Sequence, residues 1–346
     1  MTHSSNPPAV SVVIPCRNER HHIEACVRSM LSQIPPDGGY EIIVADGMSD
    51  DGTRGILAQL ARQDERLVVV DNKEKITPCG MNAGIAAAGG RYIAIAGAHH
   101  RYAPDYLRQS VAVLEETGAD NVGGAMMCDA ETRVQKAVAA AHHSAFGTGG
   151  ARWHDPGYEG PADTVFGGVY RREVFETIGL FDPALVRNQD DELNLRLTRA
   201  GGRIWQSPRI RSWYSPRGSI WGAYRQYFQY GYWKVRVIRK HRLPASPRHL
   251  VPAALILALT GLPILALVWP FAAVLWVALV VIYGVGTVFA SIAASRGWGW
   301  EVVPLMPVVF ACCHFGYGFG FLAGLRDAMI GRRGTSSFTL EITRHS

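Results

Sequence analysis

The stretch YEIIVADGMSDDGT (residues 40–53) combines a buried strand, an acidic turn and the start of a helix. Its first seven residues are mostly apolar and rich in β-branched side chains, which is typical of a strand covered on both faces. Gly, Asp and Ser residues then form a turn, and Ser49 and Asp50 are expected to cap the helix that follows. The order strand, polar turn, helix is typical of an α/β fold.

The same order recurs on both sides of this stretch. Further strands are expected at residues 9–15, 66–71 and 91–97, and helices at 19–33, 82–90, 171–178 and 190–200. Strands that alternate with helices predict a mostly parallel sheet with right-handed crossovers. Ligands bind such sheets at the carboxyl ends of the strands. Four polar turns fall at those ends and are predicted to form one site: 15–19, 46–52, 71–75 and 97–100.

The second half of the chain changes in composition. Residues 219–240 are aromatic and basic with no acidic residue, which favours a helix at a membrane interface; the alternative is an aromatic helix packed on the domain. Residues 250–294 are about twice as long as one bilayer crossing of ~20 residues requires, so a hairpin that turns near Trp269 and Pro270 is expected.

A weaker third apolar segment spans residues 303–325. With the head of the chain in the cytosol, three spans would place Arg326, Arg332 and Arg333 outside, against the positive-inside rule. Either the third segment is re-entrant or the charge bias is overridden.

Net charge and cysteine content indicate which kinds of binding partner and which compartment suit the chain. The formal net charge is +6, and much of the excess lies between Arg203 and Arg248. A basic strip beside an apolar tail favours anionic lipid head groups or diphosphates over nucleic acid. The six cysteines include no CxxC pair, and the first residues lack the pattern of a signal peptide. Reduced thiols and a head domain on the cytosolic side are therefore expected.

Two motifs, VVIPCRNE (12–19) and DGMSDDGT (46–53), closely resemble the inverting family 2 glycosyltransferases, which have the nucleotide-sugar A-type (GT-A) fold. NAGIAAAGGRYIAI resembles the stretch before the family's Asp-x-Asp turn, and GLFDPALVRNQDDELNLRLTRAGGRIW resembles its general-base region. QYGYW (229–233) is similar to the motif Gln-x-x-Arg-Trp, with Tyr232 in place of Arg. RYAPDY, DTVFGGVYRR and RNQDDELN are similar to the succinoglycan-type exopolysaccharide branch. The resemblance covers residues 9–245.

This resemblance implies a role for each matching residue. Asp190 takes the place of the general base that deprotonates the acceptor hydroxyl in a single displacement; the alternative is that Asp190 or Asp191 only caps a helix. The nucleotide sugar would be held by seven residues: Pro15, Arg17, Glu19, Asp46, Lys75, Asn82 and Gly97. The acceptor would contact Asp163, Asp191, Gln229 and Trp233.

The metal-binding turn of the family departs from its pattern here. Gly97-Ala98-His99 stands where the family has Asp-x-Asp. We expect His99 to bind a divalent cation, Mn²⁺ or Mg²⁺, together with the substrate diphosphate, and Gly97 to leave room for the ribose. His100 is expected to be a solvated turn residue. The alternatives are metal independence, with Arg and Lys stabilising the leaving group, and an inactive copy.

Together these features predict a membrane-attached inverting glycosyltransferase. It would transfer sugar from a nucleoside-diphosphate sugar, most simply a UDP-sugar, to a lipid-linked or polysaccharide acceptor in envelope or exopolysaccharide synthesis. It is expected to be multi-pass in the cytoplasmic membrane, with the catalytic domain facing the cytoplasm. The alternative is a non-catalytic scaffold in a polysaccharide assembly complex. The expected organisation is a flexible N-terminus, a GT-A domain, an interfacial helix with linker, a membrane region and a basic tail: 1–8, 9–218, 219–248, 249–326 and 327–346.

Overall fold

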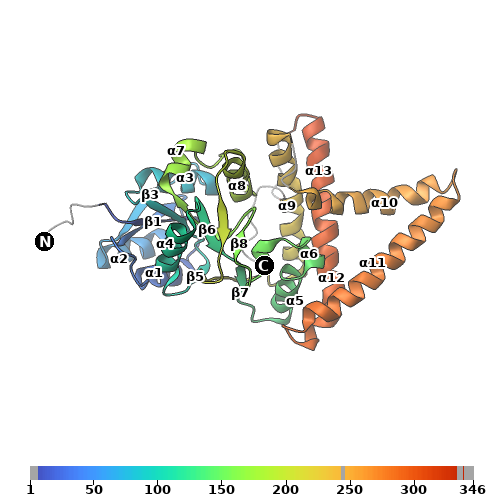
Figure 1. Ribbon diagram of the computed structural model, residues 1–346, viewed down its shortest axis with the longest axis horizontal. Coiled ribbons are helices and arrows are strands. Elements are labelled where there is room, and N and C mark those ends of the chain that lie inside the picture. Colours follow the sequence, from blue (N-terminus) through green and yellow to red (C-terminus); the bar gives the residue numbers. More distant parts are fainter. Residues whose placement is uncertain (1–6, 243–245, 333–337, 339–346) are drawn as a thin grey trace. The chain divides into compact units, whose positions relative to one another are not determined.

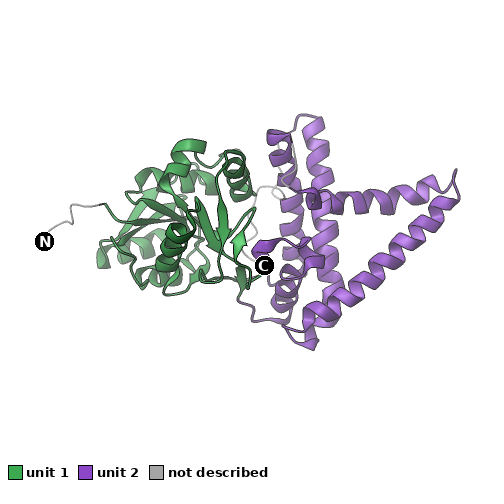
Figure 2. Cartoon of the chain, in the orientation of Figure 1, with its two compact units in different colours: residues 1–128, 155–215 green, residues 129–154, 216–346 purple. Residues whose placement is uncertain are grey.

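The computed structural model describes residues 7–242, 246–332 and 338, which form two compact units (Figure 1, Figure 2). Unit 1 takes residues 1–128 and 155–215, and unit 2 takes residues 129–154 and 216–346. Much of the expected N-terminal segment 1–8 and of the expected tail 327–346, Arg333 included, lies outside the described residues.

Unit 1 is built on an eight-stranded sheet of order β3-β2-β1-β4-β9-β6-β10-β8. The first four strands are parallel and confirm the predicted ones: β1 (Val10–Cys16), β2 (Tyr40–Asp46), β3 (Leu67–Asp71) and β4 (Tyr92–Ile95). The other half is mixed, because β9 runs antiparallel between β4 and β6. Its strands are β6 (Asn121–Gly124), β8 (Gly160–Pro161), β9 (Phe166–Arg171) and β10 (Ile204–Gln206).

Helices cover both faces of this sheet. Val12 and Ile14 of β1 pack with three helices on one face: α1 (Ile23–Leu31), α2 (Thr53–Gln63) and α4 (Tyr106–Thr117). Val13 points to the other face and packs with α3 (Thr77–Ala87), α7 (Arg172–Ile178) and α8 (Gln189–Arg199). Alternate residues of one strand therefore enter two cores, as the apolar run predicts. A small second sheet joins β5 (His100–Tyr102), β11 (Ser212–Tyr214) and β7 (Met126–Cys128).

Unit 2 is helical. Its longer helices are α5 (Arg133–His142), α9 (Ile220–His241), α10 (Val251–Leu265), α11 (Phe271–Ser295) and α13 (Tyr317–Met329). Short helical segments join them: α6 (Ala145–Thr148), η1 (Arg152–His154), η2 (Pro247–His249), η3 (Trp300–Leu305), α12 (Met306–Ala311) and the π-helical η4 (Cys312–Gly316). The α10 and α11 helices form the expected hairpin, with the turn at residues 266–270.

The segment 129–154 differs from the expected boundaries, which placed it inside the GT-A domain. In the structure it belongs to unit 2. The physical reason is the apolar face of α5, where Ala137, Val138 and Ala141 are buried against Val302 and Phe310.

The helices α9 and α13 pack with their backbones in close contact. A Cβ atom added to Gly320 would lie 1.9 Å from the carbonyl oxygen of Phe228, and one added to Gly231 would lie 2.0 Å from that of Tyr317. Gly316 and Gly324 make similar approaches one turn before and after Gly320. At these glycines no side chain separates the two backbones, which is how small-residue repeats allow close helix packing. The segment 219–240 is therefore a packed helix, and its position at a membrane interface stays a prediction.

Candidate functional site

The register of the parallel strands brings their carboxyl ends to one edge. Cys16, the last residue of β1, pairs with Asp46, the last residue of β2, and Asp46 pairs with Asp71, the last residue of β3. The expected convergence of the polar turns that follow these strands is confirmed by this register.

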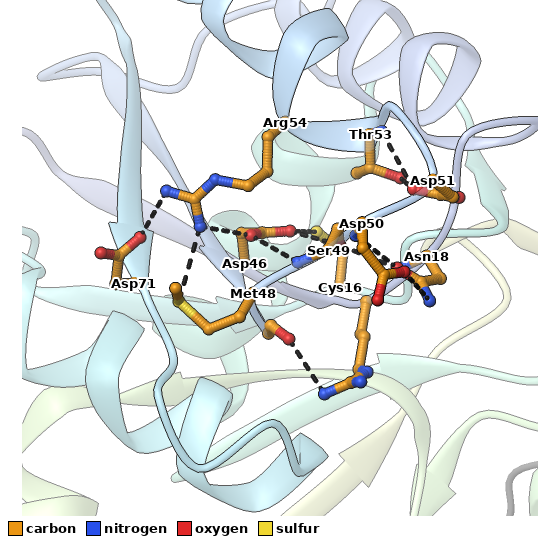
Figure 3. Close-up of polar contacts among 12 residues, drawn as sticks. Cys16, Asn18, Asp46, Met48, Ser49, Asp50, Asp51, Thr53, Arg54 and Asp71 are labelled. Carbon is orange, nitrogen blue, oxygen red and sulfur yellow. Dashed lines mark hydrogen bonds and ion pairs between the residues drawn. The ribbon is translucent and has the colours of Figure 1, made fainter.

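Asp46 is fully buried, and its carboxylate is held by several donors (Figure 3). Oδ2 accepts hydrogen bonds from the backbone N–H of Ser49 at 3.1 Å and from Nη1 of Arg54 at 2.9 Å. Oδ1 accepts the Ser49 hydroxyl at 2.6 Å, and the Cys16 thiol lies 3.8 Å away. Arg54 also donates from Nη2 to Asp71 at 2.8 Å, a bond that raises the pKa of Arg54. A carboxylate with this many fixed donors has one orientation and holds the turn that follows β2 in place.

The turns after β1 and β2 are bound to each other. The Asn18 side chain forms two hydrogen bonds with Asp50. Its Nδ2 donates to Oδ1 of Asp50 at 3.0 Å, and its Oδ1 accepts from the backbone N–H of Asp50 at 3.1 Å. The backbone N–H of Asn18 donates to the Ser49 hydroxyl at 2.9 Å, and Nη1 of Arg17 donates to the Gly47 carbonyl at 3.2 Å. Figure 3 shows this network beside Asp46. These bonds join the two turns into one rigid wall, that is, a single fixed surface formed by the turns after β1 and β2.

The prediction that Ser49 and Asp50 cap α2 is wrong. Gly52 holds the N-cap position with φ of 102°, and the backbone N–H of Thr53 donates to Oδ1 of Asp51 at 3.0 Å. Ser49 and Asp50 instead bond to the neighbouring turns, because their side chains face Asp46 and Asn18.

Left-handed backbone conformations gather in these turns. Asn18, Met48 and Lys75 follow β1, β2 and β3 and have φ of 54°, 56° and 62°, while Asn188, just before α8, has φ of 59°. Non-glycine residues rarely adopt this conformation, and such residues cluster at ligand-binding sites. Their positions support a binding site at this edge of the sheet.

The turn after β4 carries Gly97 and two histidines. A Cβ atom on Gly97 would lie 2.5 Å from Cε1 of His100, so the space expected for a ribose is filled by the His100 ring. His100 is also not a solvated turn residue: it is half-buried in β5 and packs against Phe166 and Tyr214, with ring centroids 4.9 and 5.7 Å away. The backbone of Gly97 donates to the Tyr102 hydroxyl at 2.8 Å. Gly97 is needed here for its small size.

His99 lies beside Glu19, with Nδ1 3.8 Å from Oε1. Glu19 is 2% exposed. Within the described residues no group of three or more His, Cys, Asp or Glu side chains could hold a metal ion alone. One imidazole and one carboxylate still fit a Mn²⁺ or Mg²⁺ ion whose other ligands are phosphate oxygens and water, because Mg²⁺ in particular is commonly bound by one or two carboxylates plus substrate phosphates.

Asp190 lies in the first turn of α8 and is exposed. The N-cap position belongs to Asn188, so the alternative that Asp190 or Asp191 is the N-cap is wrong. Asn194, one turn later on the same face of α8, donates to the Thr164 hydroxyl at 2.8 Å. Thr164 precedes β9, whose antiparallel direction starts it at the edge where β1–β4 end. The first turn of α8 therefore lies near the same edge as Asp46.

Two further observations concern the surroundings of Asp190. Oδ1 of Asp190 accepts the backbone N–H of Asp191 at 2.9 Å. The pKa of Tyr170 is raised, first by burial and then by the negative charge of Asp190, and the Tyr170 hydroxyl donates to Oδ1 of Asn194 at 3.2 Å. The pair Glu192 and Arg196 has a structural role, since Arg196 also donates to the carbonyl of Ile178 and to that of Leu180.

The other expected site residues fall into two groups. Pro15 is buried in β1, Lys75 is exposed after β3, and Asp163 is exposed just before β9. The Asn82 amide forms two hydrogen bonds with the backbone of Phe181, at 2.9 and 3.0 Å, so it fixes the loop before α8. Gln229 and Trp233 lie in α9 of unit 2, where Trp233 is 3% exposed and its ring is covered by Arg236.

Sequence reasoning missed Arg54. It lies eight residues after Asp46 in the first turn of α2, and only the pairing of β2 with β3 brings Asp71 within its reach. An arginine in the first turn of a helix, where a cation is unfavourable, was the available signal.

The sequence of this chain is similar to those of known proteins. The family model described as glycosyl transferase family 2 matches residues 11–179. The succinoglycan biosynthesis protein ExoA of Rhizobium meliloti (strain 1021) is 34% identical over 91% of this chain and 94% of its own length. The chain belongs to glycosyltransferase family 2. As a family 2 glycosyltransferase it has the expected α/β fold with a mostly parallel central sheet.

One more distant relative and one solved structure extend the likeness of this family 2 glycosyltransferase. A dolichyl N-acetyl-alpha-D-glucosaminyl phosphate 3-beta-D-2,3-diacetamido-2,3-dideoxy-beta-D-glucuronosyltransferase of Methanococcus voltae is 28% identical over 67% of this chain and 74% of its own. The solved structure of the mannosyltransferase PcManGT from Pyrobaculum calidifontis, in complex with GDP-Man and Mn²⁺, has a TM-score of 0.57 at 18% identity. It covers 90% of this chain and 88% of its own, so the two share a fold.

Proposed function

We propose that this family 2 glycosyltransferase is a membrane-attached inverting enzyme of exopolysaccharide or envelope polysaccharide synthesis. It transfers a sugar from a nucleoside-diphosphate sugar, a UDP-sugar as the first candidate, to a lipid-linked or polysaccharide acceptor. The observation that carries the proposal is the meeting of the polar turns after β1, β2 and β3 with the first turn of α8 at one sheet edge. The likeness to the succinoglycan protein supports the pathway class.

The nucleotide would bind along the rigid wall of the first two turns. Asp46 is fully buried, so its carboxylate would act by fixing the turn that meets the base or ribose, through its bonds to Ser49 and Arg54. Arg17 and Lys75 supply positive charge for the diphosphate. Pro15 and Asn82 would act through position, since Pro15 lies just before the last residue of β1 and Asn82 fixes the loop before α8. The N–H of Gly97 is bound to the Tyr102 hydroxyl, so Gly97 would contribute through its small size beside His100.

A divalent cation would be held by His99, with Glu19 as its neighbour, and by the diphosphate itself. When bound, such an ion neutralises charge on the departing nucleoside diphosphate. The GDP-Man and Mn²⁺ complex of the structural neighbour supports a cation in this fold. His99, Glu19 and Arg17 would together orient the diphosphate.

Asp190 would act as the general base. Inverting transfer is a single displacement, so one carboxylate removes the proton of the acceptor hydroxyl while its oxygen attacks the anomeric carbon. The exposed position of Asp190 at the start of α8 supports this role, because an acceptor can reach it. Asp191 and Asp163 are the nearest proposed acceptor contacts. Contacts of the acceptor with Gln229 and Trp233 stay predictions, and the buried ring of Trp233 would act by positioning neighbours.

Membrane attachment is proposed through unit 2. Two helical runs in the described part of the chain are long and apolar enough to cross a bilayer: Phe271–Ser295 and Trp300–Met329. The six cysteines, none of them in a disulfide, fit a reducing compartment, so unit 1 would face the cytoplasm of the cell membrane.

The direct test uses the purified full chain in detergent. UDP-, GDP- and dTDP-sugars are compared as donors for hydrolysis and transfer, with Asp190→Asn as the inactive control and Glu176→Gln, an exposed residue of α7, as the matched control. We expect one donor class to be used, and NMR of the first product to show the anomeric configuration opposite to that of the donor. No turnover with any donor would favour the scaffold alternative, and a retained configuration would refute inversion.

A further inference from the structure

The hairpin formed by α10 and α11 is the most apolar part of the molecule. The sequence has no Asp, Glu, Lys or Arg between Arg248 and Arg296. Most of the buried residues of the hairpin lie toward these two arginines: Ala253 and Ile256 on α10, and Thr287, Ser291 and Ser295 on α11. Tyr283, in the middle of α11, also contacts His314. Toward the turn Ala272 is buried, but most other side chains are exposed, and Leu267 reaches 84%. An exposed apolar surface of this length, with basic residues at its open end, fits a lipid bilayer with anionic head groups.

The first helix of the hairpin is short for a crossing, whereas α11 has 25 residues. The 15 residues of α10 measure about 22 Å at 1.5 Å per residue, whereas the hydrocarbon core is about 30 Å thick. The turn, ALVWP at residues 266–270, has no charged or hydroxyl side chain that would favour water on the far side. Length and composition therefore agree on a turn that remains inside the hydrocarbon.

The backbone N–H groups of the turn are all hydrogen-bonded within the chain. The N–H of Ala266 donates to the carbonyl of Leu262, and that of Leu267 donates to the carbonyl of Ile264. The N–H groups of Val268 and Trp269 both donate to the carbonyl of Leu265. These distances are 2.9 to 3.2 Å, and Pro270 has no N–H. Backbone groups in hydrocarbon have no water to bond with, so only a turn with this property is stable there.

Pro263 provides the clearest sign of a site without water. A proline inside a helix leaves the carbonyl four residues earlier, here that of Leu259, without its usual donor. The indole N–H of Trp276 on α11 donates to this carbonyl at 3.0 Å. The Thr260 hydroxyl likewise donates to the Ile256 carbonyl at 2.9 Å. The Trp276 contact supplies the donor that water would provide to the Leu259 carbonyl outside a membrane.

The helix α13 has a different environment from the hairpin, although its composition is apolar. Its glycines contact α9 in steps of four residues on both helices, from Tyr224 with Gly316 to Tyr232 with Gly324, so the two helices run side by side. The α9 helix has five Lys and Arg residues and no acidic residue. If α13 crossed the bilayer, α9 would carry these charges into hydrocarbon, which is unfavourable.

We propose that the 251–295 hairpin enters the bilayer, reverses within the hydrocarbon and leaves on the side where it entered, while α13 stays outside the hydrocarbon beside α9. This inference rests on the membrane attachment contained in the proposed function. Arg248, Arg296, Arg326 and Arg332 then all lie on one side of the membrane. The conflict between three spans and the positive-inside rule disappears, because the chain makes no net crossing.

The test introduces one cysteine at a time into the full chain, in sealed membrane vesicles of both orientations, and applies a membrane-impermeant maleimide. Labelling is compared with the parent chain and its native thiols. We expect Leu267→Cys to be labelled from neither side until detergent is added. Gly297→Cys, where a side chain meets no described atom within 4 Å, and Arg332→Cys should both be labelled from the same side. Labelling of Leu267→Cys from the opposite side, or of Arg332→Cys on the side opposite to Gly297→Cys, overturns the proposal.

A charged residue gives a second measurement. Leu267→Lys should reduce the fraction of chain that remains in membranes after alkaline washing several-fold, whereas Gly297→Lys should not. Equal retention of the two variants overturns the proposal, because a turn in water on the far side would accept lysine. A parent chain that washes off completely also overturns it, while hydrolysis of the nucleotide sugar by the same preparation reports separately on the transferase function.

Discussion

Asp46 and Asp71, register partners at the ends of β2 and β3, share the guanidinium of Arg54. Asp46 is completely buried and Asp71 is exposed, so the arginine joins an interior carboxylate to one at the surface. This arrangement explains how a buried negative charge is kept at the proposed nucleotide site.

Replacing Arg54 with Gln should leave Asp46 buried without a cation. Hydrogen bonds to charged groups are worth about 1.5–3 kcal/mol, and because Arg54 is partly exposed we expect a loss of about 1–3 kcal/mol in the free energy of unfolding and a higher KM for the donor. Chemical denaturation and initial rates measure both. Arg28→Gln, which removes an exposed i,i+4 pair with Glu24, should change stability by under about 0.5 kcal/mol. Equal stability of the two variants would contradict the role of Arg54.

Asp190→Asn should lower kcat by a factor of about 10² to 10⁴, the usual contribution of a general base, with little change in donor affinity. Glu176→Gln on the exposed face of α7 should keep full activity. Donor binding measured by calorimetry separates the two effects. A kcat within about twofold of the parent enzyme would exclude Asp190 as the base.

His99→Ala should raise the Mn²⁺ or Mg²⁺ concentration needed for half-maximal activity about tenfold, equivalent to ~1.4 kcal/mol of lost cation binding. The loss should be larger for His99→Ala than for His21→Ala, an exposed histidine before α1. Activity is titrated with each metal after chelation. Full turnover of the parent enzyme in excess chelator would show that no cation takes part and that Arg17 and Lys75 alone balance the diphosphate.

Gly320→Ala should destabilise unit 2, because the new methyl group would meet the Phe228 carbonyl, a backbone atom that cannot move aside. Overpacking of this kind costs about 1–3 kcal/mol. Gly261→Ala in α10, where a Cβ meets no described atom within 4 Å, should be neutral or slightly stabilising. Thermal unfolding in detergent compares the two. An equal melting temperature for both variants would show that the backbones of α9 and α13 are further apart than the structure indicates.

Unit 2 should lose stability in mild acid through His142. Burial, then the charges of His143 and Arg217, lower the pKa of His142 to about 3. Below its ordinary pKa of about 6.5 the unfolded chain binds a proton that the folded histidine does not, so the free energy of unfolding falls as pH decreases from 6.5 toward 3, by up to about 1.4 kcal/mol per pH unit. His142→Gln should flatten this slope, and His21→Gln should leave it unchanged. A slope unaffected by His142→Gln would assign the acid sensitivity to other groups.

The first half of the fold could be predicted because its signals are local. The strands β1 to β4 are apolar runs that end in polar turns, and parallel pairing follows from the helices between them, so the alignment of Cys16, Asp46 and Asp71 needed only the alternating order. The place of β9 could not be predicted in this way. Its insertion between β4 and β6 depends on pairing with residues far away in sequence, for which short-range periodicity has no signal.

In the site, the types of residue were predictable and several of their contacts were not. The acidic turn at 46–51 pointed to Asp46, but the bond of Arg54 to Asp71 and the exchange between Asn18 and Asp50 require the neighbouring turns to be in place. In unit 2, hydropathy could not distinguish a helix facing lipid from one facing another helix. The residues Gly316, Gly320 and Gly324 are equally compatible with either, and only their contacts with α9 decide.

A hairpin that returns to its own side offers no passage through the bilayer. If the polymer or glycolipid made by this enzyme is destined for the outside of the cell, a separate exporter must move it there, and this chain takes part only in assembly. Synthesis and secretion would then be two tasks, divided between different proteins and open to independent control.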